Sequence, residues 1–232
     1  MTLLSVIIPL APHEKAWQNL LPSLAQLPDD TEILLVHSSH DAAHEAVDLP
    51  NLNLRWLTSP AGRAEQMNTG ARAATGAHLW FLHADTQLAH DSLSALLQAM
   101  QRHPADLLYF DLIFLNDASR LMRLNAWGVW FRSHVLHVPF GDQGFCIARQ
   151  LFHTLGGYPE GLPYGEDHVF VWRARQHGMA ITPVNSTLYT SARKYQQHGW
   201  LKTTVMHQYL WLKQAWPEWR LLRKKFKKGD SA

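Results

Sequence analysis

Short apolar segments alternate with amphipathic segments over the first half of the chain. Strand-like segments, rich in β-branched, leucine and aromatic residues, occupy residues 5–10, 32–38, 54–59, 77–84 and 107–115. The first, second and fourth are apolar almost throughout, as are strands buried on both faces of a sheet. Segments with helical periodicity lie between them, at residues 14–27, 41–47, 62–75 and 91–102. This alternation predicts an α/β sandwich, with a mostly parallel central sheet flanked by helices.

The second half of the chain is less regular. Residues 118–131 have an amphipathic helical pattern. The stretch VPFGDQGFCIAR predicts a turn-rich loop that enters a short strand, followed by a short helix over 149–155. Residues 166–177 are predicted to form a helix that ends at Gly178.

A separate helical segment occupies the C-terminus. Apolar and aromatic residues recur there at helical spacing: Leu201, Val205, Tyr209, Leu212, Trp216 and Trp219. Two interpretations are open, namely a helix packed on the body or on a second subunit, and an amphipathic helix at a membrane surface. The chain is therefore divided into a domain of residues 1–199 and a C-terminal amphipathic helix with a basic tail at 200–232.

The charge is distributed unevenly. The chain has a formal charge of +2, and residues 220–232 hold six basic residues and one acidic residue. The remaining 15 basic and 18 acidic residues give the body a charge of −3. A general nucleic-acid-binding surface is not indicated, because the positive charge is confined to one end. The basic end would attract anionic lipid if the helix lies on a membrane.

Composition indicates one globular core. Hydrophobic residues make up 47% of the chain and charged residues 17%, which excludes a disordered protein. The single cysteine, Cys146, excludes an internal disulfide and fits a reducing compartment; its apolar neighbours favour a buried thiol over a nucleophile. No apolar run reaches the roughly 18 residues of a membrane-spanning helix. The N-terminus is predicted to be a strand closed by Pro9 and not a signal peptide, so a cytoplasmic protein is expected.

An aspartate stands where the apolar run Trp80-Phe81-Leu82 stops. In parallel α/β sheets, ligands bind beyond the carboxyl ends of the strands, which is where residues 83–85 would fall. Mg²⁺ or Mn²⁺ takes one or two carboxylates and completes its shell with phosphate oxygens and water. The imidazole of His83 beside Asp85 would favour Mn²⁺. The alternative is that Asp85 or Thr86 only begins a turn.

Three further groups carry possible chemistry. Gly165-Glu166-Asp167 begins a predicted helix, where acidic residues are also favoured by the helix dipole alone. Gly141-Asp142-Gln143-Gly144 is polar and glycine-rich, and a simple turn is the alternative. The histidines His37, His40 and His44 have a spacing that permits a zinc site, against the simpler interpretation of solvated loop histidines.

Taken together, the order of these segments resembles family 2 glycosyltransferases of the GT-A fold over nearly the whole chain. SVIIPLAPHE resembles the family's opening strand and nucleotide loop, and GRAEQMNTGARAATG its second nucleotide-sugar segment. FLHADT stands at the Asp-x-Asp metal motif and GEDHVF at the catalytic Glu-Asp. With FGDQGF and TSARK, the set is most similar to a bacterial subgroup, the arsenosugar-biosynthesis-type glycosyltransferases.

The resemblance implies an inverting enzyme that moves a single sugar from a nucleotide-diphosphate donor to an acceptor hydroxyl. A divalent cation, Mn²⁺ or Mg²⁺, would be held by Asp85 and His83. Asp167 would be the general base, oriented by Glu166. The donor-binding positions would be Pro9, Ala11, Glu14, Arg63, Asn68, Ala84 and Asp85. The acceptor-binding positions would be Gly141, Asp142, Gln143 and His168.

Three departures from the family pattern matter. His83 replaces the first Asp of the metal motif, and VHSSHDAA replaces an Asp-containing nucleotide loop. TSARKY stands where processive synthases carry Gln-x-x-Arg-Trp, so a single transfer is expected.

One alternative is a non-catalytic nucleotide-sugar-binding relative with a membrane- or partner-docking helix. A nucleotidyltransferase would need a basic, glycine-rich loop after the first strand, and PLAPHEK is not one.

The partners expected are a nucleotide-diphosphate sugar and an acceptor, lipid-linked if the C-terminal helix docks on lipid. That helix would then place the protein at the inner face of the membrane, or it would join two copies into a homodimer.

Overall fold

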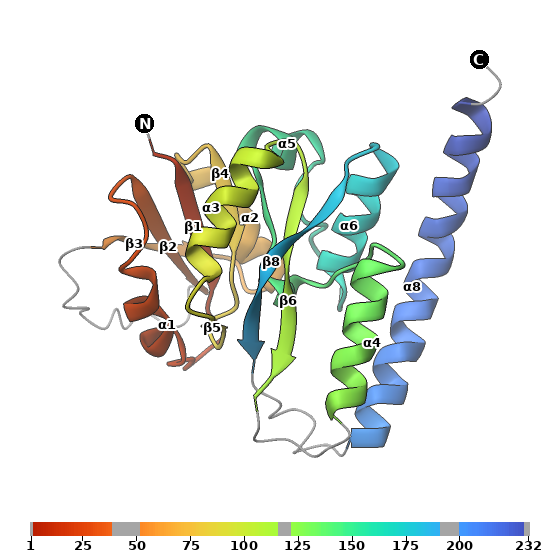
Figure 1. The fold of residues 1–232 in the computed structure, drawn as a ribbon, viewed down its shortest axis with the longest axis horizontal. Helices are drawn as coiled ribbons and strands as arrows, with labels where there is room; N and C mark the ends of the chain where they lie inside the picture. Colours follow the sequence, from red (N-terminus) through yellow and green to blue (C-terminus); the bar gives the residue numbers. More distant parts are fainter. Residues whose placement is uncertain (1, 39–51, 116–121, 191–199, 230–232) are drawn as a thin grey trace.

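The computed structural model describes residues 2–38, 52–115, 122–190 and 200–229. One sheet of eight strands in the order β3-β2-β1-β4-β7-β6-β8-β5 forms its centre (Figure 1). The strands are β1 Leu4–Pro9, β2 Thr31–Ser38, β3 Asn53–Ser59, β4 His78–Phe81, β5 Gln87–Leu88, β6 Leu107–Phe114, β7 Cys146–Ala148 and β8 Ile181–Thr190. The helices are α1 Trp17–Leu24, α2 Arg63–Ala73, α3 Ser92–Arg102, α4 Met122–His134, α5 Arg149–Thr154, α6 Glu166–Gln176 and α8 Trp200–Gly229, with a short 3₁₀ turn at Gly141–Gln143.

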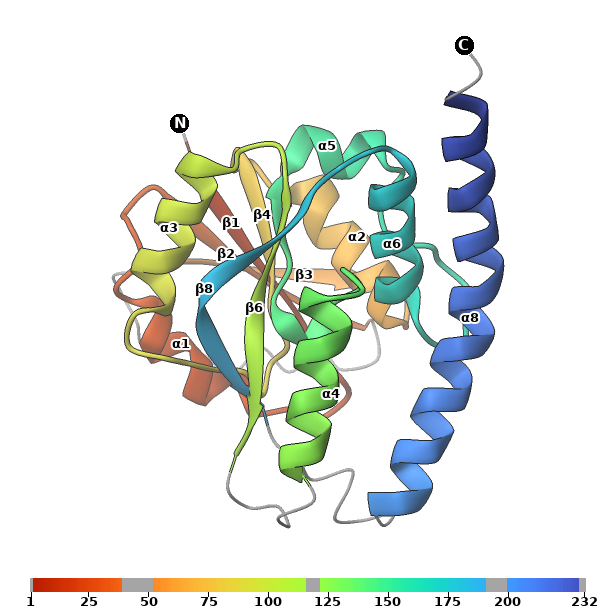
Figure 2. The ribbon, with the colours of Figure 1, turned by 45° about the vertical axis from the view of Figure 1, so that its right-hand side comes forward.

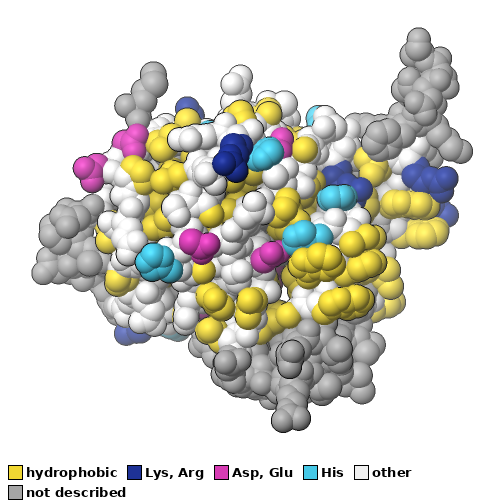
Figure 3. Space-filling model, in the orientation of Figure 1, with side chains coloured by type: hydrophobic (Ala, Val, Ile, Leu, Met, Phe, Trp, Pro, Cys, Tyr) yellow, Lys and Arg dark blue, Asp and Glu magenta, His cyan; other side chains and the backbone are white. Residues whose placement is uncertain are grey.

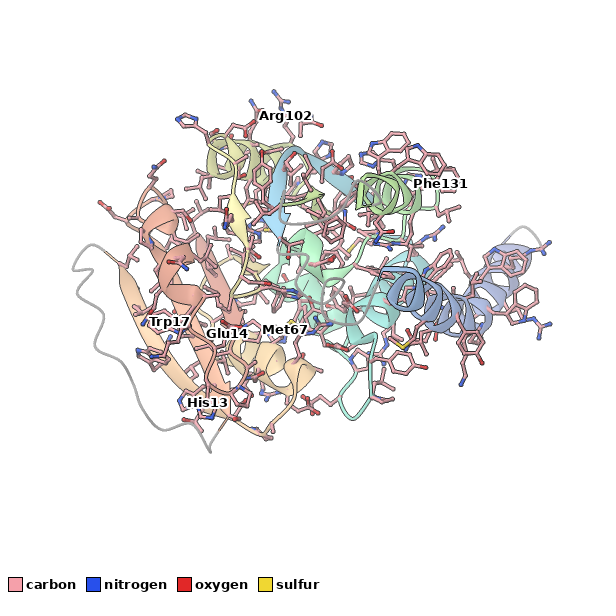
Figure 4. The ribbon with its side chains drawn as sticks, turned by 90° about the horizontal axis from the view of Figure 1, so that it is seen from below. His13, Glu14, Trp17, Met67, Arg102 and Phe131 are labelled. Carbon is pink, nitrogen blue, oxygen red and sulfur yellow. The ribbon has the colours of Figure 1, made fainter. Side chains whose placement is uncertain are left out.

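The first half of the sheet is parallel, as predicted. β1 pairs with β2 on one side and with β4 on the other, and β2 pairs with β3, all in parallel. Every residue of β1 and β2 is buried, which explains the continuous apolar runs at the centre of each strand. The predicted strand at 77–84 is longer than β4, which ends at Phe81. Because β1, β2, β3 and β4 are parallel, their carboxyl ends meet at one edge of the sheet. Figure 4 shows this edge from below.

The second half of the sheet is mixed. β7 is antiparallel to both β4 and β6, whereas β8 runs parallel to β6 with a register shift between Phe110 and Asp111. β5 is antiparallel to β8. The sequence patterns did not predict β5 or β8. β8 contains Pro183 and several polar residues, and its burial does not follow a simple alternation, so it lacks the signal of a strand.

Helices cover both faces of the sheet (Figures 1 and 2). Val6 and Ile8 of β1 pack with α1 and α3 in one core, whereas Ile7 packs with α2, α5 and α6 in the other. α8 runs beside α6 and extends past the body of the protein in Figure 2. Leu222 of α8 belongs to the second core. Both faces of the sheet are thus covered, as the predicted sandwich requires.

Two predictions about single residues have different outcomes. Cys146 is fully buried, as predicted, and burial raises the pKa of its thiol. His37 is also buried, with Nδ1 2.8 Å from the Ser38 carbonyl oxygen and Nε2 3.3 Å from Thr58 Oγ1. A solvated loop position is therefore wrong for His37, because the residue belongs to the buried strand β2. His40, His44 and the predicted helix at 41–47 lie outside the described residues.

Candidate active site

The chain turns at the end of β4, where the apolar run stops. The Thr86 amide donates a hydrogen bond to the His83 carbonyl at 3.1 Å, so a turn forms, as the simpler interpretation expected, but it begins at His83 and not at Asp85 or Thr86. Ala84 is buried, whereas His83 and Asp85 are half-buried. The turn therefore holds both side chains at the ligand-binding edge of the sheet, which is also what the metal-site interpretation requires.

Arg63, the first residue of α2, connects two parts of this edge. Its Nε donates to Glu166 Oε1 at 2.5 Å, and its Nη2 lies 3.8 Å from Asp167 Oδ2. Its Nη1 lies 3.2 Å from His83 Nε2, which must accept, because a guanidinium has only donors. Burial would lower the pKa of Arg63, but the two carboxylates raise it overall. A permanent cation thus lies between the β4 turn and the start of α6.

Asp167 is held as an ionised carboxylate at the start of α6. Its Oδ2 accepts the Gly141 amide at 2.6 Å and its Oδ1 accepts the His168 amide at 2.8 Å. Burial alone would raise the pKa of this carboxyl, but Arg63 and the two amides lower it below its usual value. A carboxylate has about four lone-pair directions, so these contacts leave capacity for a further hydrogen bond.

Two glycines make the position of Asp167 possible. Gly165, before α6, has a φ of +75°, which side-chain-bearing residues rarely adopt. A Cβ on Gly141 would come 2.9 Å from Asp167 Oδ2, so only glycine lets that backbone amide approach the carboxylate closely. The glycines of the two motifs GDQG and GED therefore have a physical reason to be there.

Asp142 adds a second carboxyl group close to Asp167. Burial raises the pKa of Asp142 to about 6, while the charges of Arg132 and Arg63 lower it and that of Asp167 raises it. Its Oδ1 is buried and has no hydrogen-bond partner among the described residues. Asp142, Asp167 and Glu166 thus form an acidic group that Arg63 partly neutralises.

Three predicted contact residues are bonded to the protein itself. Asn68 bonds through Nδ2 to the Tyr158 carbonyl at 2.9 Å and through Oδ1 to the Tyr158 amide at 2.9 Å. His168 Nε2 accepts from Trp172 Nε1 at 2.9 Å, and burial lowers the pKa of His168 to about 4. Gln143 is buried and bonded on three sides. Contact of these side chains with a substrate stays a prediction, and their visible role is to hold the loops in place.

Removal of the Gln143 side chain is expected to destabilise the fold. Its Nε2 donates to the Phe110 carbonyl at 2.9 Å, and its Oε1 accepts from the Phe140 amide at 3.1 Å and from Ser133 Oγ at 2.9 Å. Gln143→Ala leaves these buried groups unsatisfied and should lower the free energy of unfolding by about 2–4 kcal/mol. Denaturant unfolding measures this, with Gln87→Ala at an exposed position as the control. A loss below about 0.5 kcal/mol, typical of surface substitutions, would contradict the structural role.

The loop after β1 holds the other predicted donor residues. Ala11 is exposed, and Glu14 is half-buried and accepts the Ala16 amide at 2.8 Å before α1; Figure 4 shows Glu14 at the edge of the sheet. Sequence reasoning missed Gln66, which donates from Nε2 to the carbonyls of Leu10 at 2.7 Å and Val36 at 2.9 Å. Gln66 thereby links the carboxyl end of β1, just after Pro9, to the carboxyl end of β2. Its signal in the sequence was an amide at a core-facing position of a predicted helix.

The residues fit a divalent cation only in part. Among the described residues, no three His, Cys, Asp or Glu side chains are grouped as a chelating site. Asp85 alone is enough for a cation that takes its other ligands from phosphate and water. His83 fits less well, because Arg63 already occupies the lone pair of its Nε2. The donor set therefore suits a cation that binds together with a phosphorylated ligand.

Comparison with known family models covers one part of the candidate site and not the other. The model of the family described as "Glycosyl transferase family 2" matches residues 5–154. A search of curated proteins found no match. The matched segment contains Arg63, Asp85 and Asp142, and ends before Glu166 and Asp167.

Solved glycosyltransferases share the fold. Residues 1–349 of S. aureus TarS superimpose with a TM-score of 0.64 at 19% identity, over 82% of this chain and 60% of that one. The TarS complex with UDP-GlcNAc superimposes with a TM-score of 0.61 at 21% identity, over 82% of this chain and 59% of that one. The mannosyltransferase PcManGT from Pyrobaculum calidifontis, in complex with GDP-Man and Mn²⁺, superimposes with a TM-score of 0.67 at 20% identity. The match covers 95% of this chain and 68% of that one. The chain thus spans about 60% of the TarS fragment, and the expected GT-A fold is confirmed.

Proposed function

The chain belongs to glycosyl transferase family 2, and from that premise we propose that it moves a single sugar from a nucleotide-diphosphate donor to an acceptor hydroxyl, with inversion at the anomeric carbon. One observation carries the proposal. Asp167 is an ionised, buried carboxylate at the ligand-binding edge of the sheet, and Arg63 links it to the β4 turn that holds Asp85. This arrangement supports a site that combines a proton acceptor with an edge for the donor diphosphate.

Each side chain has a distinct role in the proposed reaction. Asp85 would hold Mn²⁺ or Mg²⁺, which when bound neutralises charge on the diphosphate leaving group. Arg63 is close enough to the β4 turn to contribute positive charge to the same group. Asp167 accepts the proton of the acceptor hydroxyl, whose oxygen attacks the anomeric carbon from the side opposite the diphosphate. Glu166 holds the Arg63 guanidinium and thereby fixes the geometry around Asp167.

Finer assignments are also proposals. The arsenosugar-type subgroup rests on the short motifs alone, and the single transfer rests partly on residues 191–195, which lie outside the described residues. A non-catalytic nucleotide-sugar-binding relative is the alternative. The glycines and amides that position Asp167 favour catalysis, because donor binding alone would not require an ionised acid at the start of α6.

The C-terminal helix adds a second proposal. None of the described helices combines the length and the apolar character needed to cross a bilayer. We infer that α8 contacts either a membrane surface, where a lipid-linked acceptor would be available, or a second copy of the chain. The first of these would place a cytoplasmic protein at the inner face of the membrane.

Ligand-induced thermal shifts test the proposed function. A panel of nucleoside diphosphates and their sugars, with Mn²⁺ or Mg²⁺, should contain one base that stabilises the chain. Ligand at 100 times its Kd stabilises by about 2.7 kcal/mol, which for a protein of this size raises Tm by roughly 5–10 °C. The corresponding monophosphate is the control and should shift Tm less. No shift with any nucleotide, or equal shifts with and without a chelator, would contradict the proposal.

A further inference from the structure

One face of α8 is fixed to the body of the protein. Leu222 is buried in the second core. Gln214 Nε2 donates to the Tyr164 carbonyl at 2.8 Å, and Gln176 Nε2 of α6 donates to Glu218 Oε2 at 2.8 Å. The helix therefore cannot rotate freely about its axis, and the direction of its other face is defined.

That other face is aromatic and open to solvent. Tyr209, Leu212, Trp216 and Trp219 follow the spacing i, i+3, i+7, i+10, and they are between 38% and 63% exposed. The rings of Trp216 and Trp219 stack with their centroids 5.6 Å apart. These four residues are called the α8 aromatic face. An apolar stripe of this kind is more than the scattered surface leucines of an ordinary protein, and it indicates an interaction site.

Positive charge continues the same face. The guanidinium of Arg220 lies 4.9 Å from the Trp216 ring centre, and that of Arg223 lies 4.8 Å from the Trp219 ring centre. Lys224, Lys225, Lys227 and Lys228 follow in the sequence, and α8 extends to Gly229. Along one helix, exposed aromatic rings are thus followed by a concentrated group of bases.

A second aromatic cluster lies on α4. Trp127, Trp130 and Phe131 are exposed, Trp127 by 65%, and the rings of Trp127 and Phe131 stack at 5.7 Å. Figure 3 shows hydrophobic side chains over α4 and over α8 on one side of the molecule, with Lys and Arg side chains beside those of α8. Figure 4 shows Phe131 on the outer side of α4, away from the sheet. These three residues are called the α4 aromatic cluster.

We propose that the α8 aromatic face and the α4 aromatic cluster together bind a lipid surface with anionic headgroups, with α8 lying along the interface. Indole and phenol rings are suited to headgroup depth, and the bases beyond Trp219 are complementary to anionic lipid. A second copy of this chain fits less well, because Glu218 is the only acidic residue in the sequence of α8 and its carboxylate is held against α6 by Gln176, away from the α8 aromatic face. The inference does not depend on the reaction proposed above.

Vesicle co-sedimentation with the full chain tests this proposal. Phosphatidylcholine vesicles with about one-third phosphatidylglycerol should bind the wild type at low salt, and pure phosphatidylcholine much less. Trp216→Ser/Trp219→Ser and Trp127→Ser/Trp130→Ser should each weaken binding by about tenfold or more, because interfacial binding scales with buried apolar area. Arg223→Gln should weaken binding and its salt dependence, whereas Arg102→Gln on α3 is the matched control and should not.

Three results would overturn the proposal. The first is absence of wild-type binding to anionic vesicles. The second is vesicle binding at the wild-type level by either of the two double tryptophan variants, which would show that the helix carrying those tryptophans does not contact lipid. The third is a dimer in sedimentation velocity that Trp216→Ser/Trp219→Ser dissociates, since a second copy would then cover the face. Circular dichroism of each variant confirms that the comparison is between folded chains.

Discussion

Asp167→Asn is expected to lower sugar transfer by roughly 10²–10⁴, the usual contribution of a general base, and to leave donor binding nearly unchanged. The carboxylate is ionised at neutral pH, because Arg63 and two backbone amides lower its pKa. The amide of asparagine occupies the same space but cannot take a proton from the acceptor hydroxyl. The measurement is the transfer rate of wild type and variant at saturating donor, beside donor affinity by calorimetry.

Glu166→Gln is the matched control for this prediction. It weakens the contact with Arg63 but leaves the proposed base, so its transfer rate should fall less. Both variants disturb the same guanidinium, and their melting temperatures show how much of any loss is structural. Transfer by Asp167→Asn at the wild-type rate would remove Asp167 from the base role. Loss of donor binding would instead assign Asp167 to the donor or metal site.

Asp85→Ala is expected to abolish the metal dependence of nucleotide-diphosphate binding. The wild type should bind the diphosphate more tightly with Mn²⁺ or Mg²⁺ than with a chelator. Loss of residues that only orient a metal ligand costs 10- to 100-fold in metal affinity, so loss of the ligand itself should cost at least about tenfold. Calorimetric titration with and without metal measures the difference.

His83→Ala distinguishes the contribution of His83 to metal binding from that of Asp85. Because His83 Nε2 already accepts from Arg63, its removal should leave most of the metal dependence in place. Equal metal-dependent affinity in Asp85→Ala and wild type would overturn the role of Asp85. A larger loss in His83→Ala than in Asp85→Ala would assign the cation to the imidazole.

The sequence predicted the parallel half of the fold because burial on both faces leaves a plain signal. β1, β2 and β4 are nearly continuous apolar runs, and the helix ending at Gly178 has the expected glycine with positive φ. β8 was missed because a proline and a polar run interrupt it, and only its pairing with β6 makes it a strand. Such pairing is a property of the assembled sheet.

The same distinction holds within the candidate site. Asp85 and Asp167 could be proposed as candidates from local sequence alone, one after a buried strand and the other at a helix start. The link between them could not, because Arg63 meets Glu166 across 103 positions of sequence. The buried amides Gln66 and Gln143 were likewise invisible as supports, since their partners, mostly backbone groups, are brought close only by folding.

Hydrolysis of the nucleotide sugar found in the thermal-shift panel tests the central claim most directly, with water as the acceptor and the products followed by real-time proton NMR. An inverting transfer predicts that the released sugar first appears with the anomeric configuration opposite to that of the donor, before mutarotation. The signal should require the divalent cation and Asp85, and it should be nearly absent with Asp167→Asn. A sugar released with the donor's own configuration, or released equally fast by Asp167→Asn, would contradict the proposed mechanism.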